Sequence, residues 1–353
     1  MIRLHPPASR RVLRGATAIG ASVAGALGWA IPAAAHGPAP IEPPTAAALL
    51  LGWTFPLLPT LGIVATLVCW RWAVGRVNAD HPANPVPRRR SVYLALGMAA
   101  IAVALLSGIE RYDTTLFSVH MVQHILLTLV APPLLALAAP ITLLLRLSSA
   151  ATRRRWILPV LHSRLVRVLA FPVVAWVIFA AVMWASHFTP LFDAALEDPL
   201  IHDLEHLLYL GAGLLFWWPA VAVDPAPWRM GHPVRAMYVF LQMPQNTFLA
   251  VVLLGATSVL YPHYATLERP WPPTPLADQQ AAAGIMWLAG DTVFLVAMLV
   301  ILWSWMRAER RDAPRHDRRA AAEMAAIRLR ERALADRRAR EAEDAQSSAG
   351  VSR

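Results

Sequence analysis

The chain has 353 residues, of which 57% are hydrophobic and 15% are charged, and its formal net charge is +10. Several apolar runs are near 20 residues long, which is the length that a helix needs to cross a bilayer. This composition excludes a soluble globular class and predicts an all-α fold, a polytopic membrane helix bundle. The positive charge does not indicate nucleic-acid binding, because the arginines gather in loops on one side of the apolar segments and in the C-terminal tail.

Residues 1–35 have the pattern of a signal peptide. A basic region at 10–14 precedes a short apolar stretch at 16–31, and alanines follow at a position that suits cleavage. An uncleaved N-terminal anchor helix is the alternative. Cleavage after Ala35 would make His36 the mature N-terminus, where the free amine and the imidazole could chelate copper.

Seven apolar segments follow, within a predicted transmembrane domain of residues 36–306. The expected spans are 46–74, 91–109, 115–137, 168–188, 200–223, 235–260 and 281–306. The loops between them alternate sharply in arginine content, and arginine-rich loops face the cytoplasm. The mature N-terminus is then outside and the C-terminus is cytoplasmic. The tail of residues 307–353 is charged, and we expect it to be cytoplasmic and partly helical.

Two histidine pairs share one spacing, His120 with His124 and His202 with His206. Residues four apart lie on the same face of a helix, and ionisable groups are costly in a bilayer, so the two pairs indicate a function. The predicted topology gathers six histidines from four helices at the outer side: His120, His124, His187, His202, His206 and His263.

Imidazole is the commonest protein ligand for copper, zinc and haem iron. The two pairs could supply four nitrogens to one or two ions, although the spacing alone does not choose the ion. A ligating imidazole usually donates its other N–H to an acceptor, and the candidates for that role are Glu205, Asp203 and Glu110. For His187 or His263 alone, a packed and hydrogen-bonded histidine is the alternative.

Methionines and polar groups at depth add further candidates. The thioethers of Met121, Met243 and Met286 suit Cu(I), although methionine also fills ordinary helix interfaces. Asp291 lies well inside the last span. It is either a proton acceptor or ion contact, or the partner of an interhelical hydrogen bond to the amides of the segment 242–246.

Several stretches resemble, in order, the multispan CtaG family of cytochrome c oxidase assembly proteins. They are His120-Met121-Val122-Gln123-His124 with Ala131-Pro132-Pro133, Trp184 to His187, His202-Asp203-Leu204-Glu205-His206, Phe216-Trp217-Trp218-Pro219, Met243-Pro244, Tyr261-Pro262, and Asp278-Gln279-Gln280 through Met286-Trp287. The resemblance covers residues 48–306. It implies a bacterial plasma-membrane protein that helps to mature haem-copper oxidase, by delivering copper to an oxidase subunit. The family's histidine positions correspond to His120, His124, His187, His202 and His206.

Three functions remain open at this point. The first is a non-enzymatic assembly factor that holds copper through the histidine pairs, with His187 in support. The second is an electron-transfer protein with a b-type haem between two histidines. The third is a zinc-dependent membrane enzyme with Glu205 as the general base, although a His-Glu-x-x-His arrangement is lacking. A purely structural scaffold is the remaining alternative.

Overall fold

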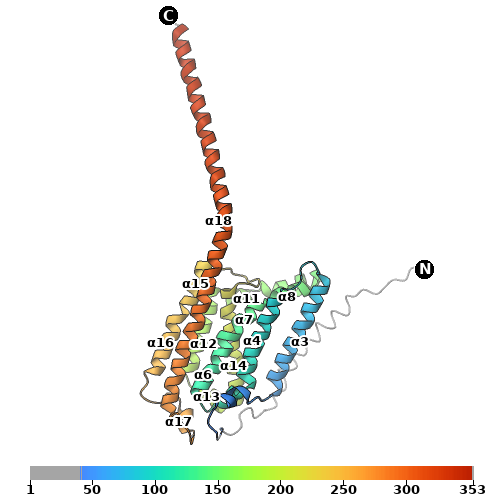
Figure 1. Ribbon diagram of the computed structural model, residues 1–353, viewed down its shortest axis with the longest axis vertical. Helices are drawn as coiled ribbons and strands as arrows, with labels where there is room; N and C mark the ends of the chain where they lie inside the picture. The colour runs from blue at the N-terminus through green and yellow to red at the C-terminus, as the bar shows by residue number, and fades with distance from the viewer. Residues whose placement is uncertain (1–39, 41, 352–353) are drawn as a thin grey trace, which may run out of the picture. The chain divides into compact units, whose positions relative to one another are not determined.

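The computed structural model describes residues 40 and 42–351, and these residues form helices with no strand among them (Figure 1). The predicted signal segment 1–35 and His36 lie outside the described residues. The chain divides into two compact units, Met1–Ala297 and Met298–Arg353.

The first unit is a helix bundle. Its helices are α2 (Ala46–Leu51), α3 (Leu57–Asp80), α4 (Arg88–Leu106), α5 (Gly108–Tyr112), α6 (Phe117–Ile125), the π-helix η1 (Leu126–Val130), α7 (Ala131–Ala138), α8 (Pro140–Leu147), α9 (Ala150–Thr152), the π-helix η2 (Arg153–Ile157), α10 (Leu158–Leu161), α11 (Arg164–Leu169), α12 (Pro172–Phe188), α13 (Leu191–Glu197), α14 (Pro199–Val221), α15 (His232–Phe240), α16 (Gln242–Leu254) and α17 (Pro262–Thr266). The last helix, α18 (Pro275–Val351), begins in this unit and continues through the second.

Five helical segments of the described chain are long and apolar enough to cross a membrane. They are Leu57–Asp80, Arg88–Tyr112, Phe117–Leu147, His232–Leu254 and Pro275–Pro314. A sixth counts if α12 and α13, which bend by 71° at their junction, form one broken span. The sequence predicts about seven spans. The predicted span 168–188 corresponds to the bent pair, and the predicted span 200–223 is not among the candidates. This segment does form α14, but Glu205, His202 and His206 lower its hydropathy.

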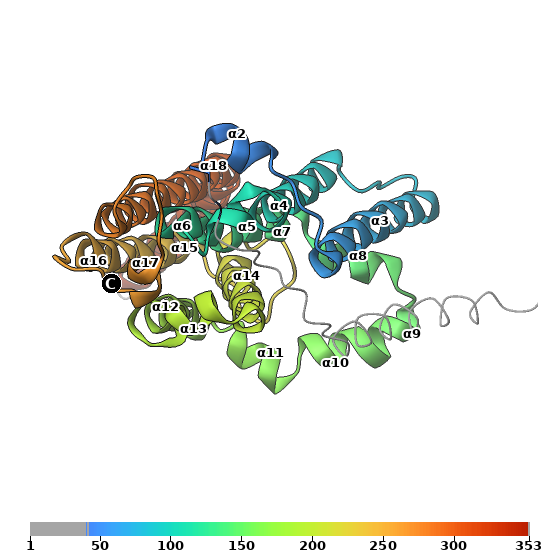
Figure 2. The same ribbon diagram turned by 90° about the horizontal axis from the view of Figure 1, so that it is seen from below.

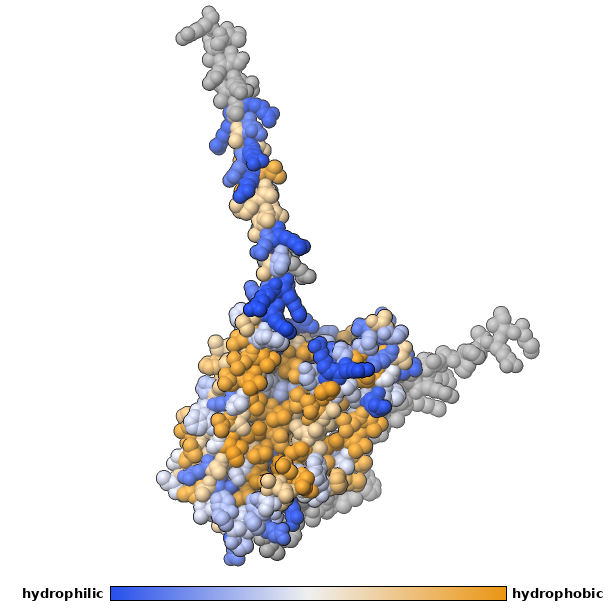
Figure 3. Space-filling model, viewed as in Figure 1, coloured by the Kyte–Doolittle hydropathy of each residue, from blue (hydrophilic) through white to orange (hydrophobic). Residues whose placement is uncertain are grey.

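Helix α14 lies at the centre of the bundle, where it packs against α7, η1, α12 and α13 (Figure 2). Helix α4 packs against α7, and α3 lies at the rim against α4 and α8. The short helices α8 to α11 lie at one end of the bundle, and α13 and α17 lie at the other (Figure 1). The bundle surface between these ends is largely apolar (Figure 3). Exposed residues such as Leu57, Val68 and Phe248 therefore face lipid.

The π-helix η1 follows from the two prolines after it. Pro132 has no N–H to donate to the carbonyl of Thr128, so this oxygen needs another partner. The indole Nε1–H of Trp217 in α14 donates to it at 3.1 Å. Gly213 lets α14 approach this point, because a Cβ there would lie 2.8 Å from the same oxygen. Irregular backbone in a buried helix is thus satisfied by a neighbouring helix.

The second unit is the continuation of α18. The predicted tail of residues 307–353 is helical throughout the part that the structure describes, to Val351, rather than only in part. The helix accommodates Pro314 without ending. The described side chains from Arg310 to Pro314 are exposed, and Arg307 stacks on Trp303 with its guanidinium carbon 4.0 Å from the ring centre.

Candidate metal centre

Four histidines meet between α6 and α14. The ring centres of His120 and His124 lie 4.0 Å apart, and those of His202 and His206 lie 4.2 Å apart. His120 and His202 connect the two pairs, with ring centres 5.4 Å apart. All four are buried. The i, i+4 spacing on two packed helices thus produces one continuous cluster of imidazoles.

Glu205 reaches the first pair from the turn between His202 and His206. Its Oε2 lies 3.8 Å from the Nε2 of His120 and 3.8 Å from the Nε2 of His124. This separation is too long for a hydrogen bond. It is close to the spacing of two atoms that each bind one ion at about 2.1 Å. These three residues form the first of three possible metal-ligand sets.

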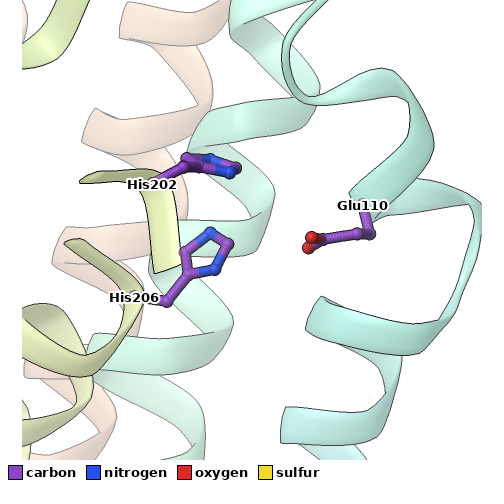
Figure 4. Close-up of side chains that lie close together, drawn as sticks. All are labelled: Glu110, His202 and His206. Carbon is purple, nitrogen blue, oxygen red and sulfur yellow. The ribbon is translucent and has the colours of Figure 1, made fainter. Parts of the chain in front are cut away.

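Two further carboxylates come from the end of α5. Glu110 forms a second set with His202 and His206, whose side chains point toward it across the gap between α5 and α14 (Figure 4). Asp113 forms a third set with His120 and His202, and its Oδ2 lies 3.7 Å from the Nε2 of His202. Burial raises the pKa of Asp113 well above its usual range. Each set contains two imidazoles and one carboxylate.

Gln123 connects two of these ligands. Its amide nitrogen donates to the Oε2 of Glu110 at 2.6 Å and to the carbonyl of Ala104 at 3.1 Å. Its amide oxygen therefore accepts from the Nε2 of His206, at 3.0 Å. This contact orients the imidazole of His206, and ligating imidazoles usually have such a hydrogen-bonded partner.

Six buried polar atoms of the first set have no hydrogen-bond partner among residues 40 and 42–351. They are both ring nitrogens of His120, both ring nitrogens of His124 and both carboxylate oxygens of Glu205. Buried polar groups that lack a hydrogen bond are costly and rare in proteins, and coordination of an ion is one way in which such groups are satisfied. The donor set therefore fits a metal ion.

The cluster is enclosed rather than open. Phe192 of α13 is fully buried and packs against the rings of His120, His124 and His187, with ring centres 5.0, 6.5 and 5.8 Å away. The sequence predicts that these histidines gather at the outer side of the membrane, but it does not predict a cover over them. The 71° bend between α12 and α13 folds Phe192 back over the rings.

A small cavity lies beside the cluster, with a volume of about 30 Å³. His124 and His187 line it, together with Met121, Met183 and Met286. The other lining residues include the amides Gln242, Gln245 and Asn246. The cavity is far too small for a porphyrin, and the paired histidine rings are already in contact. The geometry therefore gives no support to the haem alternative.

The remaining predicted residues lie elsewhere. Asp203 is exposed, unlike its buried neighbour His202, and it belongs to none of the three ligand sets. Its charge is nevertheless close enough to Glu110 to interact with it. Met243 is not among the cavity's lining residues in the described chain; Met183 takes that place. The ring of His263 is hydrogen-bonded to the carbonyl of Thr114 at 2.9 Å. This favours the alternative of a packed, hydrogen-bonded histidine.

Asp291 accepts hydrogen bonds from two side chains of α16. These are the amide of Asn246, at 3.0 Å, and the hydroxyl of Thr247, at 2.7 Å. Of the two alternatives that the sequence leaves open, the geometry favours the interhelical hydrogen bond. Glu205, in turn, lies where a ligand would lie, next to two imidazole nitrogens.

Sequence reasoning missed Asp113, Gln123, Met183 and Phe192. Asp113 and Gln123 carried a usable signal, since both are polar residues next to or within an apolar span. Phe192 and Met183 carried none, because apolar residues are ordinary in such segments and only the bend of the chain brings Phe192 to the histidines.

Comparison with known proteins finds one matching family and several relatives. Residues 68–308 match the family described as cytochrome c oxidase caa3 assembly factor. Uncharacterised proteins of Mycobacterium bovis and Mycobacterium tuberculosis are each 31% identical over 291 residues, which is 80% of this chain. One of Mycobacterium leprae is 30% identical over 286 residues, or 79% of the chain. The chain spans only 44% of the length of the first two relatives and 43% of the third. No solved structure matches the chain.

Proposed function

This chain belongs to the cytochrome c oxidase caa3 assembly factors, and from that premise we propose that it binds copper and hands it to an oxidase subunit. The copper is cargo, and no chemical conversion is required of the protein. The first binding set is His120, His124 and Glu205. His202 with Asp113, and His206 with Glu110, provide adjoining ligands into which the ion can move.

The observation that carries the proposal is the group of six buried donor atoms without hydrogen bonds on His120, His124 and Glu205. A structural cluster would satisfy these atoms internally. Two imidazoles and a carboxylate suit a divalent transition ion. Because His120 and His202 each belong to two of the three sets, an ion could change ligands stepwise and never lose all of them.

We also propose on which side of the membrane the copper is held. The arginine-rich helices α8 to α11 are expected on the cytoplasmic side, and the cluster lies near α13 at the opposite end of the bundle (Figure 1). Copper would then be held near the outer face of a bacterial plasma membrane, where an oxidase subunit could receive it. Release requires α13 to move, since Phe192 covers the rings.

The test is the copper content of the detergent-purified full chain after loading with Cu(II), measured by mass spectrometry. We expect about one or two coppers per chain in the wild type. Glu205→Gln and the double variant His120→Ala/His124→Ala should lose most of this copper. Glu197→Gln is the matched control, because it makes the same change of side chain at an exposed position of α13.

Two results would contradict the proposal. One is equal copper in the wild type and in Glu205→Gln, when both elute as folded, monodisperse protein. The other is a Glu205→Gln variant that lacks copper yet restores full oxidase activity to cells that lack their own assembly factor. The second result would separate metal binding from oxidase assembly.

A further inference from the structure

The cavity beside the cluster has a different ligand chemistry from the cluster itself. Three thioether side chains line it, from three helices: Met121 of α6, Met183 of α12 and Met286 of α18. No carboxylate lines it in the described chain. A volume of about 30 Å³ holds a single ion or one or two waters. The site is therefore small, neutral and rich in sulfur.

His187 provides a nitrogen ligand whose tautomer is fixed. Its Nδ1 lies 2.7 Å from the carbonyl oxygen of Met183, so Nδ1 carries the proton and donates it. The lone pair is then on Nε2. This atom is buried, in a side chain that is 5% exposed, and it has no hydrogen-bond partner in the part of the chain that the structure describes. A backbone carbonyl that orients an imidazole in this way is typical of metal-binding histidines.

Ordinary packing does not explain why the methionines and the oriented imidazole of His187 line one cavity. Methionine often fills gaps between helices, and Met121 and Met286 do belong to a buried apolar cluster, but a cavity remains beside them. An apolar cavity would need no imidazole with a free lone pair on its wall. The Oε1 of Gln242, another lining residue, is also buried and has no hydrogen-bond partner among the described residues. The cavity thus has polar groups that can take a ligand.

We propose that this cavity is a second metal site, specific for a soft monovalent cation of the Cu(I) class, with Nε2 of His187 and the thioethers of Met121, Met183 and Met286 as ligands. Thioethers and imidazole favour Cu(I), and the absence of a carboxylate among the described lining residues disfavours harder divalent ions. The identity of the physiological ion rests on the proposed function, whereas the existence of the site does not.

The test is binding of Ag(I), which has the same ligand preference and does not change oxidation state. The full chain is used in a Cys69→Ser background, because Cys69 is an exposed thiol that would bind silver. Calorimetry should find a tight site that Met121→Leu/Met286→Leu weakens at least tenfold. These substitutions conserve volume, so the fold is expected to survive. Met98→Leu is the matched control, since Met98 is also buried but packs in a separate apolar cluster.

A second measurement identifies the ligands directly. X-ray absorption of the protein loaded with Cu(I) should show sulfur neighbours, and these should diminish in the double methionine variant. Nitrogen and oxygen neighbours alone, or silver affinity that the double variant leaves unchanged, would overturn the inference.

The two proposals can fail separately. Glu205→Gln should lose Cu(II) and keep Ag(I), and Met121→Leu/Met286→Leu should do the opposite. If Glu205→Gln abolishes Ag(I) binding and the methionine variant keeps it, silver binds at the cluster, so this inference is wrong and the proposed function stands. If neither metal binds to the wild type, both are wrong.

Discussion

Gln123 shows how a single residue organises a buried polar cluster. It is fully buried, and it bonds to Glu110, to the carbonyl of Ala104 and to His206, which lies 83 positions further along the chain. Its two ends have opposite hydrogen-bonding character, so the amide can satisfy a carboxylate on one side and an imidazole N–H on the other.

We therefore predict that Gln123→Leu destabilises the bundle. The leucine fills a similar volume but leaves Glu110 and His206 without this partner, at a cost of about 1–3 kcal/mol. The measurement is the midpoint of thermal or denaturant-induced unfolding in detergent. Gln280→Leu is the control, because Gln280 is exposed and should change little. Equal midpoints for the two variants would mean that the Gln123 contacts do not stabilise the fold.

The sequence predicts some residues of the site and misses others, for a physical reason. His120, His124, His202 and His206 are recognisable because four-residue spacing fixes their helix face. The role of Gln123 depends on the relative register of α6 and α14, and no local pattern encodes that register. The same holds for Asp203 and Glu205, which look equivalent in the sequence. Only the packing decides that the second of them faces the cluster.

Helix α14 packs very closely against the segment of Thr128 and Pro132 at one position, Gly213. At Gly213 an added Cβ would lie 2.7 Å from the Cγ of Pro132 and 2.8 Å from the carbonyl oxygen of Thr128. Two residues earlier, Gly211 has no atom within 4 Å of such a Cβ. The two glycines belong to the same helix and differ only in what they face. They form a natural pair for testing whether helix contact, and not helix propensity, holds the central helix in place.

Gly213→Ala should destabilise the bundle by about 1–3 kcal/mol, because the clash involves backbone and a rigid proline ring. Gly211→Ala should be neutral or slightly stabilising, since alanine is the better helix former. Unfolding midpoints in the same detergent measure both. A further consequence is that Gly213→Ala should lower copper binding, since a shift of α14 also moves Glu205. If both alanine variants behave alike, the approach of α14 to the proline-containing segment is not tight.

The elements themselves were largely predictable, and their interruptions were not. Apolar length predicts spans at 46–74, 91–109 and 235–260, because crossing a bilayer requires such a length. The structure has the corresponding segments at Leu57–Asp80, Arg88–Tyr112 and His232–Leu254. The interruptions are different: they are the break between α12 and α13 and the π-helix η1. They depend on which carbonyl oxygen a proline leaves without its intrahelical N–H donor, and on which neighbouring residue donates a hydrogen bond to that oxygen. Trp217, for example, satisfies the carbonyl of Thr128 from 89 positions away. The sequence shows the proline but not its partner.

The whole molecule separates its charges between the two ends of the bundle. Arg153, Arg154 and Arg155 lie in η2 at the end formed by α8 to α11, and the acidic α13 lies at the other (Figure 1). Membrane insertion retains arginine-rich loops on the cytoplasmic side. The end that carries the histidine cluster should therefore face outward. The orientation follows from charge distribution alone and is independent of any metal.

Thiol labelling tests this orientation. In a Cys69→Ser background, Ala265→Cys in α17 and Ala150→Cys in α9 place single exposed thiols at opposite ends. A membrane-impermeant maleimide should label Ala265→Cys in intact spheroplasts and Ala150→Cys only after the membrane is permeabilised. The reverse pattern would put the cluster on the cytoplasmic side, so that copper would have to be loaded from within. The same result would contradict delivery to an outward-facing oxidase subunit while leaving metal binding itself intact, because the ligand sets do not depend on which side they face.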